Sequence, residues 1–131
     1  MNKKLKLVIL GAGESGVGTA ILGKKEGFEV FVSDYGKIKN NYKQVLLHQE
    51  IKWEEEVHSE TVILSADLVM KSPGIPDNAL IVLKLKEKGV AVISEIEFAA
   101  KYTTATLIGI TGSNGKTTVA TMTYQILKDA G

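Results

Sequence analysis

Residues 5–16 read LKLVILGAGESG, an apolar run followed at once by glycines in the pattern G-x-G-x-x-G. A short apolar run that ends in glycine indicates a buried strand, and the apolar spacing over 16–26 indicates a helix after it. In such a unit Gly11 permits the tight turn, Gly13 lets a diphosphate approach the backbone, and Gly16 lets helix and strand pack closely. Free amides and the dipole at the helix start favour an anion. The stretch therefore predicts a strand–turn–helix unit that binds a phosphate group.

Apolar runs and helical patterns alternate along the rest of the chain. Further strands are predicted at 29–33, 67–71, 90–93 and 105–111, and helices at 42–49, 77–88, 94–101 and after residue 118. Asp77 and Ser94 are the expected N-caps of the helices that they precede or open. In the helix after Asp77, Leu80 and Leu83 are expected on one face. Strands separated by helices favour right-handed βαβ units and a parallel sheet.

The composition allows one full domain and excludes several classes of protein. The chain has 131 residues, of which 44% are hydrophobic and 24% charged. Its net charge of +1 supplies no broad electrostatic surface, so no nucleic-acid or membrane partner is expected. The absence of cysteine excludes disulfides and thiolate metal sites. The apolar run 7–10 is too short for a secretion signal or a membrane span, so the protein is expected in the cytoplasm.

Asp34 stands at the end of the second predicted strand. In a dinucleotide-binding unit a carboxylate at this place reads a ribose hydroxyl, which strengthens the weak signal of the glycine hexapeptide. The residues alone leave two kinds of ligand open, a dinucleotide such as NAD and a nucleotide-sugar. An NAD-binding regulatory module without catalysis is therefore the alternative function.

A second glycine loop, GITGSNGKTT at 109–118, follows the last predicted strand. Its backbone N–H groups would surround phosphate oxygens, Lys116 would reach the β- and γ-phosphates, and Thr117 would present its hydroxyl to Mg²⁺. The general pattern G-x-x-x-x-G-K-[ST] requires glycine at position 110, where this chain has Ile110. The loop is therefore the shortened form G-x-x-G-K-T, and it predicts ATP binding.

Taken together, these motifs resemble the Mur ligases and their folylpolyglutamate synthase relatives, which use the shortened loop. The resemblance covers essentially the whole chain and rests on VILGAGESG at 8–16, Asp34, KSPGIP at 71–76, SEIEF at 94–98 and TGSNGKTT at 111–118. It is most specific for the branch that adds D-glutamate to UDP-N-acetylmuramoyl-L-alanine in peptidoglycan (cell wall) synthesis. The resemblance implies ATP-dependent ligation, in which the L-alanyl carboxylate attacks the γ-phosphate. The amine of D-glutamate then displaces phosphate from the acyl phosphate.

The resemblance also implies two binding sites. The UDP part of the substrate is expected at Glu14, Ser15, Gly16, Asp34, Tyr35 and Gly74. ATP is expected at Gly112, Ser113, Asn114, Gly115, Lys116, Thr117 and Thr118. Thr117 would be the Mg²⁺ ligand, and Lys116 would be the catalytic residue that stabilises charge on the transferred phosphoryl group.

The predicted fold class is α/β, with a Rossmann-like parallel sheet over 1–93. Residues 94–131 are expected to supply the first strand, P-loop and helix of a truncated ATPase domain. The chain is thus expected to be the N-terminal portion of a longer, monomeric enzyme whose other catalytic residues lie beyond Gly131. Because the P-loop would lack neighbouring strands, this portion alone is expected to be inactive.

Other conspicuous side chains are interpreted without a functional role. His48 and His58 have no partner at metal-ligand spacing and are expected on the surface. Trp53 is expected to anchor packing. Residues 54–56, EEE, are expected to form a solvated turn.

Overall fold

The computed structural model of the chain describes residues 3–105 and 128. The strands are β1 (Lys6–Leu10), β2 (Glu29–Asp34), β3 (Lys52–Glu55), β4 (Leu68–Lys71) and β5 (Ala91–Ile93). The helices are α1 (Glu14–Lys25), α2 (Asn40–His48), α3 (Glu60–Ile63), α4 (Leu80–Lys88) and α5 (Glu95–Ala100). Strands and helices alternate along this part of the chain, which confirms the predicted α/β class. Of the strand predicted at 105–111 only residue 105 is described, and of the glycine loop and helix predicted after it only residue 128 is described.

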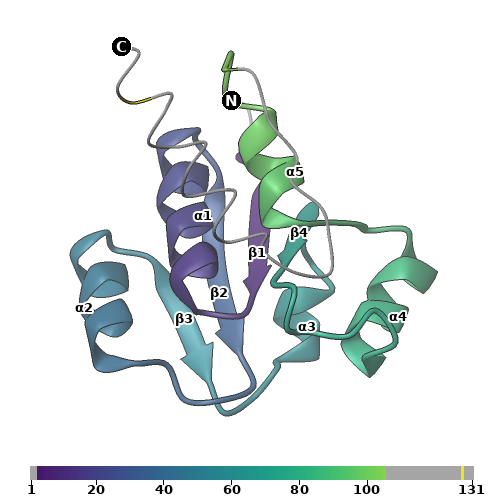
Figure 1. Ribbon diagram of the computed structural model, residues 1–131. Coiled ribbons are helices and arrows are strands. Elements are labelled where there is room, and N and C mark those ends of the chain that lie inside the picture. The colour runs from purple at the N-terminus through teal and green to yellow at the C-terminus, as the bar shows by residue number, and fades with distance from the viewer. Residues whose placement is uncertain (1–2, 106–127, 129–131) are drawn as a thin grey trace, which may run out of the picture.

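β1 is the centre of a parallel five-stranded sheet with the order β3-β2-β1-β4-β5. Val8 of β1 lies opposite Phe31 of β2 on one side and Val69 of β4 on the other. The chain runs outward from β1 to β3 and then returns to β4 beside β1, so the winding reverses between β1 and β4. The arrows of β1, β2 and β3 point the same way in Figure 1. In open α/β sheets, ligands bind outside the carboxyl ends of the strands at such a reversal.

The side chains of β1 alternate between two hydrophobic layers. Leu7 and Ile9 pack in the layer that contains buried residues of α1, α2 and α5. Val8 and Leu10 pack in the opposite layer, with buried residues of α3 and α4. All four side chains are fully buried, and each such burial contributes roughly 1.5–3 kcal/mol relative to exposure. Helices therefore cover both faces of the sheet and leave its carboxyl edge for a site.

The sequence pattern does not predict β3 and α3. β3 reads KWEE, in which Trp53 is the single apolar residue, and it lies at one edge of the described sheet. Trp53 packs against the layer that contains Leu46, which confirms it as a packing anchor. The prediction of a solvated turn at 54–56 is wrong, because Glu54 and Glu55 belong to β3. Pairing with β2, and not hydrophobicity, fixes this strand.

Helix α4 begins later than the sequence predicts. Its N-cap residue is Ala79 and not Asp77. The backbone N–H of Ala79 donates to the carbonyl oxygen of Pro76 at 3.1 Å, so Asp77 lies inside a turn. The Asp77 carboxylate instead lies 3.4 Å from Nζ of Lys71, at the end of β4. Asp77 therefore helps to hold the turn that precedes the helix.

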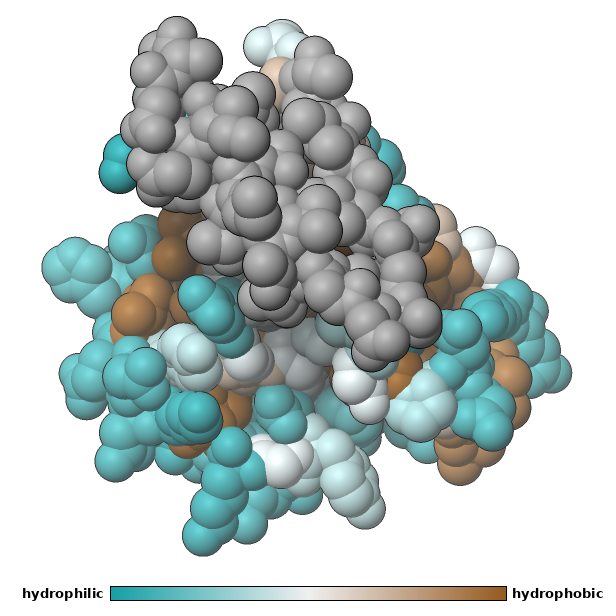
Figure 2. Space-filling model, viewed as in Figure 1, coloured by the Kyte–Doolittle hydropathy of each residue, from teal (hydrophilic) through white to brown (hydrophobic). Residues whose placement is uncertain are grey.

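The buried face of α4 is formed by Ile81, Val82 and Leu85. These positions share one side of a helix and cover the sheet. Leu80 and Leu83 point elsewhere and are 66% and 49% exposed. Hydrophobic surface is accordingly visible over the region of α4, at the lower right of Figure 2. The face that carries Leu80 and Leu83 is thus not the face that packs in the core.

Helix α5 begins with the predicted cap and packs on the sheet. The Ser94 hydroxyl accepts a hydrogen bond from the Glu97 backbone N–H at 3.2 Å, as the S-x-x-E pattern predicts. Phe98 is fully buried, with ring centroids 5.8 Å from Phe28 and 5.1 Å from Tyr102. Helix α5 follows the domain boundary predicted at residue 93, and that boundary stays a prediction.

We expect Phe98→Ala to destabilise the fold by about 3–5 kcal/mol, because it empties a volume shared by α1, α5 and the sheet. Ile96→Ala on the same helix is the matched control. Ile96 is 68% exposed, so its loss should change the free energy of unfolding by less than about 0.5 kcal/mol. Denaturant unfolding followed by circular dichroism measures both. Equal effects of the two substitutions would contradict the packing of α5.

Candidate functional site

The first glycine loop connects β1 to α1 through close backbone contacts. Gly11 has a φ of +101°, and a Cβ at this position would lie 2.5 Å from Oγ of Ser72. A Cβ at Gly16 would lie 1.9 Å from the carbonyl oxygen of Gly11. Both positions therefore exclude a side chain. Gly13 differs, because a Cβ there would meet no atom within 4 Å. The space that faces Gly13 is open.

Asp34 connects this loop to the turn that follows β2. Its Oδ2 accepts a hydrogen bond from the Ala12 backbone N–H at 2.7 Å. Its Oδ1 accepts one from the Gly36 backbone N–H at 2.8 Å. Each carboxylate oxygen thus holds one turn in place. Asp34 positions the two loops that flank it, whatever further contact it makes.

A cavity of about 980 Å³ lies at the carboxyl ends of the strands, where the winding reverses. Four of the predicted UDP-site residues line it: Ser15, Asp34, Tyr35 and Gly74. Its other lining residues are Gly11, Gly13, Glu56, Val57, His58, Glu60, Ser72, Pro73, Ile75, Pro76, Ala79, Leu80 and Ile81. Of the remaining predicted residues, Gly16 is buried below the loop and Glu14 is exposed in the first turn of α1. Neither lines the cavity.

The turn after β4 forms one wall of the cavity. The Ser72 backbone N–H donates to the Leu10 carbonyl oxygen at 2.9 Å, which places the turn beside the glycine loop. The Ile75 backbone N–H donates to the Ser72 carbonyl oxygen at 3.1 Å. Lys71 Nζ donates to the Ile75 carbonyl oxygen at 2.6 Å. These bonds close the turn around Gly74, which lines the cavity.

The opposite wall comes from residues after β3, which sequence reasoning missed. The expectation that His58 is an isolated surface residue is wrong. Its Nδ1 lies 2.6 Å from Oγ of the buried Ser33, and its ring centroid lies 5.6 Å from that of Tyr35. Ser33 also donates to Oε1 of Glu54 at 2.6 Å. The contact between His58 and Ser33 could be predicted from the sequence only if the pairing of β3 with β2 were known. This pairing brings residues 54–58 beside Ser33.

Ser33, Glu54 and His58 form a hydrogen-bonded cluster in which burial and neighbouring groups shift pKa values in opposite directions. Burial raises the pKa of Glu54, but hydrogen bonds from Ser33 and Ser59 and the nearby His58 outweigh it and leave the pKa below 4.5. Burial lowers the pKa of His58 below 6.5, although the charges of Glu54 and Asp34 act in the opposite direction. At neutral pH the cluster therefore contains a carboxylate and a neutral imidazole.

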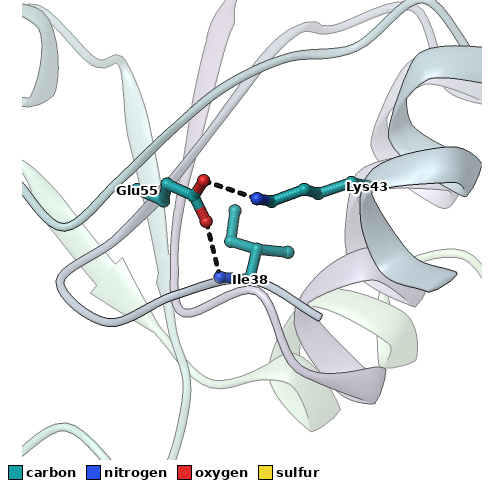
Figure 3. A network of polar contacts seen from close by, with 3 residues as sticks. All are labelled: Ile38, Lys43 and Glu55. Atoms are coloured by element: carbon teal, nitrogen blue, oxygen red, sulfur yellow. Dashed lines mark hydrogen bonds and ion pairs between the residues drawn. The ribbon is translucent and has the colours of Figure 1, made fainter. Parts of the chain in front are cut away.

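The turn that carries Tyr35 is held from the other face of β3 (Figure 3). Oε2 of Glu55 accepts a hydrogen bond from the Ile38 backbone N–H at 2.8 Å, and Oε1 lies 2.5 Å from Nζ of Lys43. These two hydrogen bonds hold the pKa of Glu55 below its ordinary value. The Glu56 backbone N–H also donates to the Gly36 carbonyl oxygen at 3.1 Å. Strand β3 thus fixes the position of the turn at the cavity mouth.

The predicted ATP site lies outside the described residues. Gly112, Ser113, Asn114, Gly115, Lys116, Thr117 and Thr118 all belong to this part of the chain. Within 3–105 and 128, no three His, Cys, Asp or Glu side chains gather in a way that could hold a metal ion. The same residues include no helix that is long and apolar enough to cross a membrane.

We expect Glu54→Gln to lower the pKa of His58 further, because it removes a negative charge that favours the imidazolium while keeping an oxygen for the Ser33 hydroxyl. Glu56→Gln is the matched control, since Glu56 is exposed and is not among the charges that act on His58. An NMR titration of the His58 ring protons measures both. A rise of the His58 pKa in Glu54→Gln would refute this electrostatic account.

Comparison with known proteins places the chain in a family. A family model described as the MurD N-terminal domain matches residues 4–80. Two curated relatives are each called UDP-N-acetylmuramoylalanine--D-glutamate ligase. The relative from Christiangramia forsetii is 62% identical over 96% of this chain, and that from Bacteroides thetaiotaomicron is 58% identical over 95%. The chain spans about 28% of the length of each of these relatives.

Solved structures agree on the fold. A pseudomurein peptide ligase type C from Methanothermus fervidus is 32% identical, with a TM-score of 0.67 over 98% of this chain and 27% of that one. A murein peptide ligase from Psychrobacter arcticus is 24% identical, with a TM-score of 0.70 over 97% of this chain and 27% of that one. The family model alone covers more than half of the chain. The chain therefore belongs to the family of MurD N-terminal domains.

Proposed function

We propose that this chain holds the UDP part of UDP-N-acetylmuramoyl-L-alanine, within a ligase that joins D-glutamate to that substrate in peptidoglycan synthesis. The observation that supports this most is the cavity at the carboxyl edge of the sheet, bordered by the open face of Gly13. The curated relatives carry the name of this ligase. Because the chain spans about 28% of their length, the whole reaction is proposed for a protein that contains it.

The diphosphate would bind at the start of α1. The first backbone N–H groups of a helix have no partner within the helix, and they attract anions together with the helix dipole. Ser15 adds a hydroxyl that lines the cavity. Glu14 is acidic and exposed, so its contribution would come from the backbone and not from the carboxylate. Gly16 would act indirectly, by letting α1 approach β1.

The nucleoside would lie between the turn after β2 and the turn after β4. Tyr35 is 75% exposed, lines the cavity and would provide a ring on which a base can stack. Gly74 lines the other wall without a side chain. Asp34 would border the uridine while it holds both neighbouring loops. This arrangement assigns the nucleotide recognition to the described part of the chain.

Phosphoryl transfer is assigned to the loop at 112–118. Lys116 would stabilise charge on the γ-phosphate of ATP while the substrate carboxylate attacks it, and the amine of D-glutamate would then displace phosphate. Mg²⁺, held with the help of the Thr117 hydroxyl, would neutralise phosphate charge. We further propose that the ligase is a cytoplasmic monomer without nucleic-acid or membrane partners.

The alternative of an NAD-binding regulatory module shares the glycine loop and Asp34 with the proposed function, and no observation favours it over the ligase. In that class the acidic residue after the second strand reads the ribose, and Asp34 occupies this place while it also accepts two backbone N–H groups, so it does not discriminate between the two functions. The named relatives are ligases. Parallel titrations with UDP-N-acetylmuramoyl-L-alanine and NAD discriminate between the two functions. Tighter binding of NAD would support the alternative.

We expect Gly13→Val to weaken UDP binding by at least about tenfold, because the new side chain would fill the space proposed for the diphosphate. The fold should survive, since no atom lies within 4 Å of the added Cβ. Gly18→Val is the matched control, because Gly18 is an exposed residue of α1 with equally open surroundings. Isothermal calorimetry with UDP measures the affinity of each variant.

If a folded Gly13→Val protein keeps its UDP affinity, the glycine loop is not part of the UDP site. If Gly18→Val loses as much affinity as Gly13→Val, the loss comes from a general change in α1 and not from the filled space beside Gly13. Thermal unfolding of both variants establishes that the folded state is retained.

In a ligase that contains this chain, we expect Lys116→Ala to lower kcat by a factor on the order of 100–1,000, as for other groups that stabilise transition-state charge. Affinity for the UDP-substrate should stay the same, because the proposed UDP site uses other residues. A phosphate-release assay with all three substrates measures kcat, and calorimetry measures the affinity. Unaltered turnover would exclude Lys116 from the reaction.

A further inference from the structure

His58 is the side chain of the cavity that the proposed function has not used. It lies on the wall after β3, and its ring contacts that of Tyr35 at a centroid distance of 5.6 Å with an interplanar angle of 45°. Tyr35 is also expected to border the nucleoside. The two rings therefore form one aromatic wall on which a nucleoside would rest.

The hydrogen bonds of Ser33 determine which nitrogen of His58 carries the proton. Glu54 is a carboxylate at neutral pH and can only accept, so the one hydroxyl hydrogen of Ser33 is donated to Glu54 Oε1 at 2.6 Å and not to the Val57 carbonyl oxygen, which lies farther away at 3.3 Å. Ser33 Oγ can then only accept from His58 Nδ1, which lies 2.6 Å away. The neutral imidazole therefore has its proton on Nδ1. Its Nε2 is an acceptor without a proton.

This Nε2 is available to a ligand. No hydrogen bond within the described residues uses it, and none of their buried side-chain polar atoms lacks a partner. The His58 ring is only partly buried and lines the cavity. The charged groups around it are the carboxylates of Asp34 and Glu54, with Glu56 and Glu60 also on the cavity wall. The wall can accept hydrogen bonds and offers few donors.

We propose that His58 determines specificity for the nucleoside by accepting, at Nε2, a hydrogen bond from an N–H or O–H group of the uridine. This inference rests on the proposed UDP site. Two groups of uridine have the required chemistry, the N3–H of uracil and the ribose hydroxyls. Uracil donates from N3, whereas cytosine has an acceptor there, so contact with the base would select UDP over CDP. Contact with the ribose would instead select UDP over 2′-deoxy-UDP.

The Ser33–His58–Glu54 arrangement fits this positioning role and not a nucleophilic one. Ser33 is fully buried, so its oxygen cannot reach a substrate. Its hydroxyl instead fixes the imidazole ring and its tautomer, and Glu54 fixes the hydroxyl. Glu54 is itself held by the Ser59 backbone N–H at 2.8 Å. A preorganised acceptor loses little freedom when the ligand binds, which favours discrimination by a single hydrogen bond.

The test uses the 131-residue chain and three probes, UDP, CDP and 2′-deoxy-UDP, titrated by calorimetry at pH 7.5. His58→Asn keeps an N–H near the position of Nδ1 for Ser33 and removes Nε2. We expect it to bind UDP about tenfold more weakly, in line with the loss of one hydrogen bond. Its preference for UDP over CDP, or over 2′-deoxy-UDP, should fall toward one. His58→Gln, which can place an amide oxygen near the position of Nε2, should restore part of both.

A second measurement does not depend on the fold of a variant. In the unmodified chain, the ¹⁵N signal of His58 Nε2 should move toward the value of a hydrogen-bonded nitrogen when UDP is added.

If His58→Asn loses only its preference for UDP over CDP, the base is the hydrogen-bond donor. If it loses only its preference over 2′-deoxy-UDP, the ribose is the donor. If UDP binds the unmodified chain but leaves the Nε2 signal unchanged, the inference about His58 fails and the UDP site stands. The inference also fails if folded His58→Asn keeps the full preference. Absence of UDP binding to the unmodified chain would overturn the proposed function itself.

Discussion

The carboxylate of Asp34 is the interaction on which the cavity depends. One oxygen holds the glycine loop at Ala12, and the other holds the turn at Gly36. Both loops follow neighbouring strands of the same parallel sheet, so a single side chain joins the glycine loop to the turn after β2. The absence of a side chain at Gly16 lets α1 pack directly against the glycine loop, because a Cβ there would lie 1.9 Å from the Gly11 carbonyl oxygen. The cavity is therefore built before any ligand arrives.

Strand β3 then places the remaining wall, and it does so with two adjacent glutamates. Successive side chains of a strand point to opposite faces. Glu54 accordingly reaches Ser33 beside His58, while Glu55 reaches Ile38 and Lys43 on the other side. Residues 54 and 55, whose sequence suggests a charged turn, thus hold the segments that carry the Tyr35 and His58 rings in place. The four hydrogen-bonding partners of the Glu54 and Glu55 side chains come from β2, α2, the turn after β2 and the loop after β3.

The sequence predicts the parts of the site whose signal is local. The glycine loop, Asp34 and the turn at 72–76 each follow an apolar strand, and the parallel sheet brings the ends of these strands together. β3, α3 and the role of His58 could not be predicted in this way. KWEE has too little hydrophobic alternation to indicate a strand, and it is ordered by pairing with β2 and by Trp53. The predicted start of α4 is wrong for a related reason. Asp77 is a good N-cap residue by type, but its carboxylate pairs with Lys71 and the helix begins after Ala79.

The fold by itself does not choose between a dinucleotide and a nucleotide-sugar, because both kinds of ligand use a glycine loop at a winding reversal. The choice lies in the groups that surround the nucleoside. Each oxygen of Asp34 accepts one backbone N–H and keeps a second acceptor site, so Asp34 can also accept a hydrogen bond from the nucleoside. Around this part of the cavity, the described residues offer the Tyr35 ring and the Nε2 of His58. Under the proposed function, the Tyr35 ring would stack on the base and Nε2 of His58 would accept one hydrogen bond from the nucleoside.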